Sequence, residues 1–213
     1  MQQGERSERS RAAILDAALE LFSHRGYGAT SMRDIAGKAG VSTGSVYHHF
    51  EEKEAIFQAL LEQFQAVTKR ADFPINVALE RAQSFDDFDL LAAAAREVVE
   101  TWRAHVALFY VDAVEFEGRH IQRFYTDLAT RFEQFAAGNR ERLQLDTRMR
   151  ADVPPAAALL FATRVFMYYF SVEAIFGVDQ QLGLPTADAT RMMARILRSG
   201  MLRPPPDATP PPA

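Results

Sequence analysis

Cysteine is absent from the 213-residue chain, which also has a single tryptophan and no proline before Pro74. The missing thiols exclude a disulfide scaffold, a cysteine nucleophile and a thiolate metal site. Long charge-free apolar runs are also lacking. The longest apolar stretch begins at Val153 and is interrupted by Arg164, whereas a membrane-spanning helix needs about 20 apolar residues. The first residues are polar and charged, unlike a secretory signal peptide. The sequence therefore predicts a soluble, cytoplasmic protein with no cofactor, no metal and no membrane partner.

Basic residues are not in excess, since 24 lysines and arginines stand against 28 acidic residues, for a formal net charge of −4. Such a balance argues against a general nucleic-acid coat protein. The charge is unevenly distributed, however. Residues 1–53 carry seven basic and seven acidic residues, so the whole acidic excess follows Lys53. A neutral first segment that binds DNA would depend on specific contacts, while the acidic remainder favours solubility.

Helical periodicity fills the space between the prolines, and no alternating strand pattern occurs. With 48% hydrophobic residues, the chain can bury a substantial core. We therefore predict an all-α fold of nine or ten helices. Six of the ten prolines lie in residues 204–213, which predicts an extended, disordered tail. The expected helices cover about residues 9–24, 31–40, 42–50, 52–70, 87–105, 106–116, 119–145, 153–176 and 186–200.

The most informative segment runs from Thr30 to Lys53. Ser31 and Asp34 have the spacing of a capping box that would begin one short helix, and Gly40 would end it in a tight turn before a second. Residues small or apolar enough to pack these two helices together are Ile35, Ala36, Ala39, Val41, Val46 and Phe50. This pattern is typical of a helix-turn-helix, whose second helix enters the DNA major groove.

The same segment resembles the TetR family of one-component, ligand-responsive transcriptional regulators. The resemblance covers about residues 9–60, and the rest of the chain matches only in its layout as a helical domain. The matching residues are Phe22, Gly26, Thr30, Ser31, Ile35, Ala36, Ala39, Gly40, Val41, Ser42, Gly44, Val46, Tyr47, His49, Phe50 and Lys53.

The resemblance implies DNA contacts along the two short helices and at the start of the next one. It assigns base reading to Thr43, Gly44 and Tyr47. Arg6, Arg9 and Arg11 could add a basic arm, whereas Glu51 and Glu52 depart from the basic or neutral residues of many relatives and weaken attraction to phosphate. The predicted DNA-binding residues are Ser31, Arg33, Ser42, Thr43, Gly44, Ser45, Tyr47, His48, His49 and Lys53.

The resemblance also implies a ligand pocket in the larger helical domain, where 19 of the 23 aromatic residues lie. An ordinary packed core would explain the same aromatic residues. His105 and Arg164 could orient a polar or anionic ligand group, although a salt bridge of Arg164 to Glu173 or Glu115 is the alternative. The candidate ligand-binding residues are Trp102, His105, Phe109, Tyr110, Phe116, Phe132, Phe161, Arg164, Phe166, Tyr169 and Phe170.

Two further helices carry more apolar surface than one subunit needs. The helix after Val153 is apolar on more than one face, and residues 186–200 have an apolar stripe of their own. The resemblance implies that these helices from two subunits form a four-helix interface. The candidate interface residues are Leu159, Thr163, Met167, Met192, Met193, Ile196 and Leu197.

Catalytic and metal sites find little support. Glu117 and His120 have the Glu-x-x-His spacing of di-iron bundles, which need a second such motif that the chain lacks. His48 and His49 are adjacent on a helix and point roughly 100° apart, so they cannot chelate one ion.

These patterns predict three segments: a helix-turn-helix domain (1–53), a ligand-binding and dimerisation domain (54–203) and the tail (204–213). We predict a regulator rather than an enzyme. It would be a homodimeric repressor, released from a palindromic operator by a small hydrophobic effector such as a fatty-acyl or aromatic compound. A transcriptional activator and an effector-independent DNA-binding protein are the alternatives.

Overall fold

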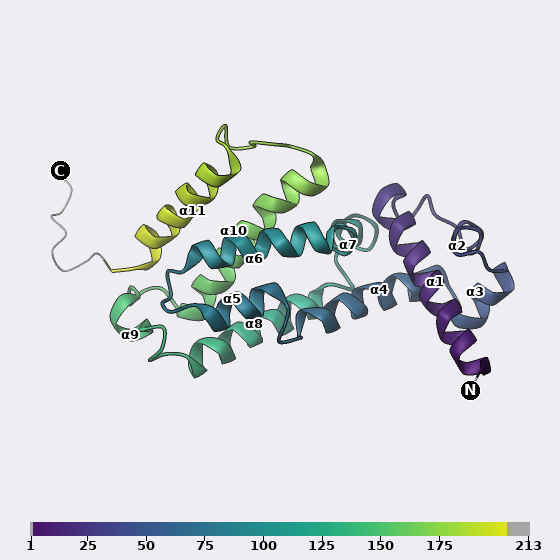
Figure 1. Ribbon diagram of the computed structural model, residues 1–213, viewed down its shortest axis with the longest axis horizontal. Coiled ribbons are helices and arrows are strands. Elements are labelled where there is room, and N and C mark those ends of the chain that lie inside the picture. Colours follow the sequence, from purple (N-terminus) through teal and green to yellow (C-terminus); the bar gives the residue numbers. More distant parts are fainter. Residues whose placement is uncertain (1, 204–213) are drawn as a thin grey trace. The chain divides into compact units, whose positions relative to one another are not determined.

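The computed structural model describes residues 2–203, so the predicted tail at residues 204–213 lies outside the described residues. Within this range every regular element is a helix, apart from an isolated bridge between Met149 and Leu202. The predicted all-α fold is confirmed. The helices (Figure 1) are α1 (Gln2–Arg25), α2 (Met32–Ala39), α3 (Thr43–His49), α4 (Lys53–Thr68), α5 (Pro74–Arg81), α6 (Phe88–Thr101), α7 (Arg103–Glu115), α8 (Gln122–Gly138), α9 (Leu145–Arg148), α10 (Pro155–Phe176) and α11 (Thr186–Met201).

The two short helices begin and end at the predicted capping residues. The Ser31 hydroxyl accepts a hydrogen bond from the Asp34 N–H at 3.1 Å, and the Asp34 carboxylate accepts one from the Ser31 N–H at 2.9 Å. Gly40 ends α2 with a φ of 67°, a conformation that glycine adopts without a Cβ clash. Ser42 then caps α3, because its hydroxyl accepts a hydrogen bond from the Ser45 N–H at 3.1 Å. The predicted capping box and turn are confirmed.

The start of α1 and the stretch around Pro74 differ from the sequence prediction. α1 begins at Gln2 instead of Arg9, so the basic residues expected to form an arm lie on a helix. The stretch around Pro74, expected to be broken, contains α5, which starts at that proline. Proline suits the first turn of a helix because its missing N–H has no partner there.

Two long helices are shorter than predicted. The helix expected over 87–105 is interrupted at Trp102, whose backbone leaves helical geometry (φ −112°, ψ 31°) and separates α6 from α7. The helix expected over 119–145 ends at Gly138, a residue of low helix propensity. The next residue, Asn139, donates its side-chain amide to the Phe135 carbonyl at 2.8 Å and so competes with continued helix.

The chain forms two compact units. The first contains residues up to Arg70 together with residues 102–125, and the second contains residues 71–101 and the chain from Thr126 onward. α4 and α7 therefore belong to the same unit as α1, α2 and α3. The compact units do not divide at residue 53, and the functional division predicted there stays a prediction.

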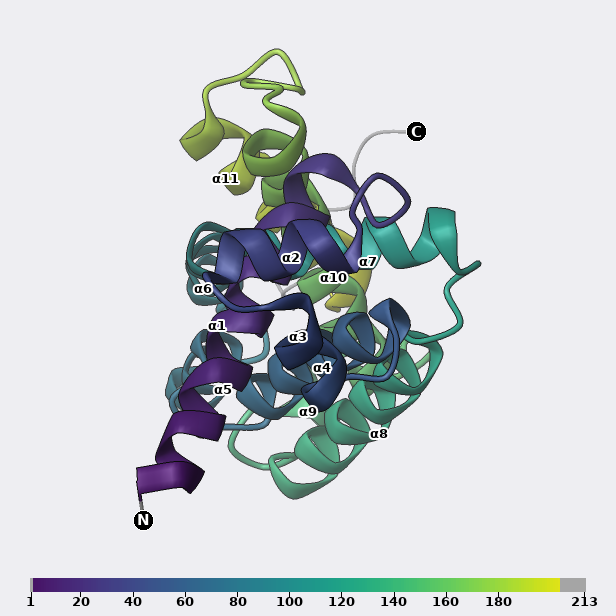
Figure 2. The same ribbon diagram turned by 90° about the vertical axis from the view of Figure 1, so that its right-hand side faces the viewer.

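The core of the first unit joins the helix-turn-helix to α4 and α7. Figure 2 looks onto α1, α2 and α3, with α2 and α3 lying beside α1. The apolar faces of α2 and α3 point into this core, so the polar residues on their opposite faces remain exposed. The most deeply buried residues of the core are Ile14, Leu15, Ala18, Phe22, Ile35, Val46, Ile56, Phe57, Leu60 and Leu108.

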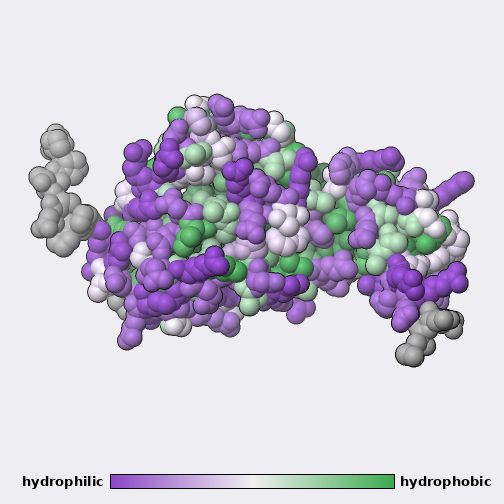
Figure 3. Space-filling model, in the orientation of Figure 1, coloured by the Kyte–Doolittle hydropathy of each residue, from purple (hydrophilic) through white to green (hydrophobic). Residues whose placement is uncertain are grey.

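The second unit is built around α6 and α10, which pack along each other, with α5 and α11 also against α6. By length and composition alone α10 could cross a membrane. Several of its residues are instead buried in the unit, among them Ala162 and Phe166, as in the core helix of a globular domain. Figure 3 shows hydrophilic side chains over much of the visible face, with apolar ones scattered among them.

Candidate DNA-binding surface

Helix α3 is held to the first unit by one side of its surface. Val46 is fully buried and Phe50, the residue that ends the helix, is 6% exposed. On the opposite side Thr43, Gly44 and Tyr47 are exposed, and Tyr47 is 54% exposed. The ring and hydroxyl of this exposed tyrosine suit contacts with DNA bases and phosphate.

Other predicted residues of α3 surround this face. Ser42 and His48 are exposed, whereas Ser45 and His49 are half-buried. The Ser45 hydroxyl lies 3.2 Å from that of Ser10 on α1. The rings of His48 and His49 meet edge to face at 5.3 Å. The outer surface of α3 therefore offers hydroxyl, imidazole and backbone groups, all of which hydrogen-bond to nucleic acids.

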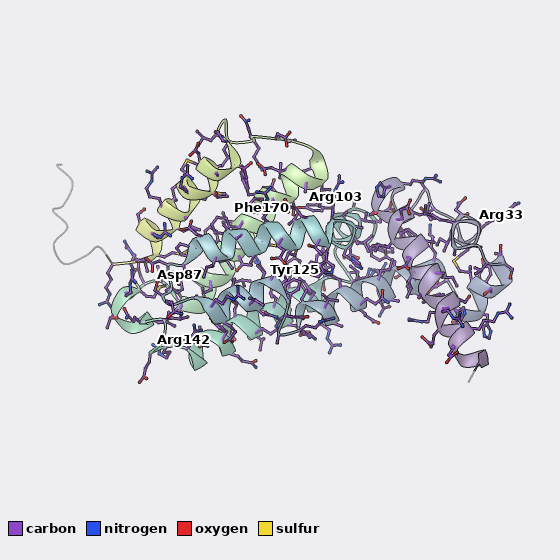
Figure 4. The ribbon with its side chains drawn as sticks, viewed as in Figure 1. Arg33, Asp87, Arg103, Tyr125, Arg142 and Phe170 are labelled. Atoms are coloured by element: carbon purple, nitrogen blue, oxygen red, sulfur yellow. The ribbon has the colours of Figure 1, made fainter. Side chains whose placement is uncertain are left out.

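Helix α2 contributes one extended cation. Arg33 is exposed, and Figure 4 shows its side chain projecting away from the ribbon. The Ser31 hydroxyl, by contrast, donates to the Asp34 carboxylate at 2.5 Å, and these hydrogen bonds lower the pKa of Asp34. Ser31 is thus engaged in capping α2, while Arg33 has the geometry of a phosphate contact.

Lys53, at the start of α4, is also engaged within the first unit. Its ammonium donates to the carbonyl oxygens of Tyr27 and Thr30, both at 2.7 Å. An ammonium has three N–H donors, so these bonds leave one for another partner. Its role as a phosphate contact stays a prediction, and its structural role joins α4 to the loop before α2.

The arginines expected to form a basic arm lie along α1. Arg9 Nε donates to the Glu5 carbonyl at 3.3 Å, and the Arg11 guanidinium lies 5.2 Å from the Phe50 ring centroid. Arg6 is exposed on the same helix. The positive charges are therefore carried on a helix that adjoins the end of α3.

The predicted ligand-binding residues divide between the two units. Trp102, His105, Phe109 and Tyr110 are half-buried in the first unit, and Phe116 is buried there. The Phe116 ring lies 4.6 Å from that of Tyr27 and 5.0 Å from that of Phe57, so it packs in the helix-turn-helix core. In the second unit the buried members are Phe132, Phe166, Tyr169 and Phe170, and the exposed ones are Phe161 and Arg164.

Two of these placements change the chemistry expected of a ligand site. Arg164, expected inside an apolar helix, is exposed, because it lies on the outer face of α10. The carboxylates considered as its partners accept other hydrogen bonds: Glu173 from Tyr169 at 2.7 Å and Glu115 from the Gly28 N–H at 3.1 Å. His105 stacks on Phe64 with ring centroids 5.5 Å apart, and burial lowers its pKa.

An apolar pocket lies within the second unit, between α5, α6, α8 and α10. Its volume is about 20 Å³, about the space of one water molecule and too small for a hydrophobic effector. None of the predicted ligand-binding residues lines it. The lining residues are Ala78, Leu79, Ala82, Ser84, Phe85, Asp87, Phe88, Leu91, Phe135, Leu143 and Leu159.

Most predicted interface residues lie inside the second unit. Leu159, Thr163, Met193 and Leu197 are buried, and the Thr163 hydroxyl donates to the Leu159 carbonyl at 2.8 Å. Met167 and Met192 are half-buried, while Ile196 is 59% exposed. The apolar pattern of α10 and α11 thus mixes residues packed on α6 with residues that face outward. Tyr168, which was not among the candidate interface residues, is exposed and lies one turn from Arg164 on α10.

The sequence also did not predict the contacts of the Glu-x-x-His segment. His120 contacts Asp112 and Glu54, which bind it from α7 and α4. The spacing identified His120 as a residue of interest, but the partners are 8 and 66 residues away, and only the tertiary structure brings them together.

Comparison with known proteins agrees with this arrangement. A family model described as bacterial regulatory proteins, tetR family, matches residues 14–60. The chain is 28% identical over 153 residues to the HTH-type transcriptional repressor KstR2 of Rhodococcus jostii, a match covering 71% of this chain and 73% of the relative. It is 45% identical over 56 residues to the HTH-type transcriptional regulator UidR of Escherichia coli, covering 26% of this chain and 29% of that protein.

A similar fold occurs in the crystal structure of NalD from Pseudomonas aeruginosa, described as the secondary repressor of the MexAB-OprM multidrug efflux pump. The superposition covers 93% of this chain and 98% of NalD with a TM-score of 0.61 and 24% identity. At this identity the likeness concerns the fold alone.

Proposed function

The chain belongs to the TetR family of bacterial regulatory proteins and is a DNA-binding transcriptional regulator rather than an enzyme; from this premise we propose a cytoplasmic, homodimeric repressor that a small hydrophobic effector releases from its operator. The observation that carries the proposal is the outer face of α3, where Thr43, Gly44 and Tyr47 are exposed while Val46 anchors the helix. The family-model match over residues 14–60, which includes this segment, supports it, as do the matches to KstR2 and UidR.

DNA binding is assigned to residues 1–53. Thr43, Gly44 and Tyr47 would read bases in the major groove, and Arg33 would contact phosphate. Two symmetric heads would read half-sites about 34–36 Å apart, so the operator would be near-palindromic. Further contacts with the DNA backbone would complete the surface. They would come from Ser31, Ser42, Ser45, His48, His49 and Lys53.

Dimerisation is assigned to the outward faces of α10 and α11. Phe161 and Tyr168 on α10 are 56% and 62% exposed, and Ile196 on α11 is 59% exposed. Solvent-exposed apolar side chains on neighbouring helices favour burial against a second copy. The inner faces of these helices would then pack within the second unit through the buried residues Leu159, Thr163, Met193 and Leu197.

Effector binding is assigned to the domain after residue 53. The effector would be an apolar compound that carries an uncharged polar group. Since burial lowers the pKa of His105, its imidazole is neutral at physiological pH and suits a hydrogen bond more than an ion pair. Phe109 and Tyr110 on the same helix supply aromatic surface. Native mass spectrometry of the freshly purified protein would identify a retained fatty-acyl or aromatic compound.

Selection of bound sequences from random DNA tests the proposal. The expected result is one enriched, near-palindromic sequence that footprints as two half-sites. Enrichment of no sequence over random DNA would contradict a sequence-specific regulator.

The dimer is tested separately by size-exclusion chromatography with light scattering. Ile196→Glu should convert a dimer to a monomer, because a charge at the interface would be buried without a partner. Leu90→Glu, at a residue 40% exposed on α6, is the matched control and should remain dimeric. A wild-type monomer at micromolar concentration would contradict the assigned symmetry.

A further inference from the structure

A cluster of ionisable side chains connects α4, α7 and the turn before α8 within the first unit. His120 Nδ1 lies 2.6 Å from Oδ1 of Asp112, and its Nε2 lies 3.0 Å from Oε1 of Glu54. The Asp112 side chain is fully buried and that of His120 is 11% exposed. None of these three groups is used in the predicted DNA contacts, so the cluster needs another explanation.

The geometry makes His120 a bridge between two helices. Its two ring nitrogens face carboxylate oxygens on different elements, Asp112 on α7 and Glu54 on α4. Both separations are within hydrogen-bonding distance. Removal of the ring would therefore disconnect α4 from α7 at this point and leave the buried Asp112 carboxyl with one hydrogen bond fewer.

The surroundings hold the three groups in place. Asp112 Oδ2 accepts a second hydrogen bond from the Ile121 N–H at 3.3 Å. The rings of Phe57 and Phe116 lie 5.7 Å and 4.6 Å from the imidazole and limit its contact with water. Among the charged residues, Arg119 also faces the cluster, with its Nη2 3.5 Å from Glu54 Oε1.

Glu54 lies in the first turn of α4, which follows α3 after three residues. Its neighbour Lys53 binds the carbonyl oxygens of the loop before α2. On the same loop the Gly28 N–H donates to Oε1 of Glu115, at the end of α7, at 3.1 Å. The end of α7 and the turn after it therefore hold both segments that flank the helix-turn-helix.

We infer that His120 is a positioning residue for DNA binding: by bridging Asp112 and Glu54, its imidazole ring fixes the first turn of α4, and with it α3, relative to α7. The inference rests on the proposed function, because the surface that it positions is the proposed operator-binding surface. Loss of either contact releases the first turn of α4 from α7, so the bridge raises operator affinity.

Operator affinity tests the bridge in full-length wild-type protein, in Glu54→Gln, in His120→Gln and in the double variant. Each single variant should bind about fivefold or more weakly than wild type, and the double variant should bind no more weakly than the weaker single one, because the same bridge is lost. His24→Gln is the matched control, since His24 is exposed at the end of α1 and bonds only to the same helix. It should bind as wild type does. Wild-type affinity in Glu54→Gln, or additive losses in the double variant, would overturn the inference.

A readout without DNA separates this inference from the proposed function. Hydrogen exchange of the α3 and α4 amides is compared between wild type, Glu54→Gln and His24→Gln at one pH. Faster exchange in Glu54→Gln alone is expected. Identical exchange in wild type and Glu54→Gln would overturn the bridge even if no operator is found. Glu54 is 35% exposed, so this variant decides the question if His120→Gln does not fold.

Discussion

The Lys53 ammonium nitrogen lies 4.0 Å from the centroid of the Tyr27 ring, over the aromatic face. The same nitrogen binds the Tyr27 and Thr30 carbonyl oxygens. Burial lowers the pKa of Lys53, and the nearby Glu115 opposes this effect. A residue at the position of a phosphate contact thus also holds the loop that precedes α2.

Replacement of Lys53 tests this structural role. Lys53→Met should lower the free energy of unfolding by about 1–3 kcal/mol, since two backbone carbonyls lose their donor. Lys38→Met is the control, because Lys38 forms an exposed ion pair with Glu20, and such pairs contribute about 0–1 kcal/mol. Urea unfolding measures both. Equal, small losses would contradict the role of Lys53 in holding the loop.

The turn between α2 and α3 makes a second prediction. Gly40→Ala should destabilise the protein by about 1–2 kcal/mol, because a residue with a Cβ is strained at a φ of 67°. Gly37→Ala, inside α2 with nothing within 4 Å of the added Cβ, should instead stabilise it by about 0.5–1 kcal/mol. Thermal unfolding of the two variants compares them directly. A Gly40→Ala variant as stable as Gly37→Ala would show that the turn conformation is not required.

The exposed tyrosine of α3 makes the third prediction. Tyr47→Ala should weaken specific operator binding by about 1–3 kcal/mol without changing the thermal midpoint, because the side chain packs little within the protein. Fluorescence anisotropy with operator DNA and with a scrambled duplex measures specific and non-specific binding. Equal weakening on both duplexes would assign Tyr47 to phosphate contact rather than base reading.

The sequence predicted the helix-turn-helix in detail because its signals are local. Ser31, Asp34, Gly40 and Ser42 determine the helix ends through contacts within a few residues. The long-range pairs could not be predicted, since nothing near His120 indicates Glu54. The periodicity of α10 likewise indicated an apolar helix but not which face packs on α6, so buried Leu159 and exposed Phe161 were not distinguished.

The fourth prediction concerns Asp86, in the loop before α6, and its contribution to stability. Burial alone would raise the pKa of Asp86, but a hydrogen bond from Ser84 and the charges of Arg148 and Arg198 outweigh it and lower the pKa. A carboxylate with a lowered folded-state pKa stabilises the fold above its unfolded pKa, and this contribution is lost as the pH falls through the folded pKa. Asp86→Asn should therefore cost about 1–3 kcal/mol near pH 7.

The acid range distinguishes this linkage from a loss of packing. Urea unfolding of wild type and Asp86→Asn should converge as the pH is lowered from about 5 to 3. Asp89→Asn is the control, because Asp89 is 72% exposed and also pairs with Arg198. It should cost little at any pH. A constant difference between wild type and Asp86→Asn down to pH 3 would contradict the assigned cause.

In the proposed complex, two copies of α3 read two half-sites on one face of the duplex. This geometry is tested by the affinity for the selected operator before and after insertion of five base pairs between the half-sites, about half a helical turn. The insertion should abolish cooperative reading and lower affinity toward the non-specific level, by about a thousandfold or more. Unchanged affinity for the lengthened operator would show that the two copies of α3 do not read the half-sites together.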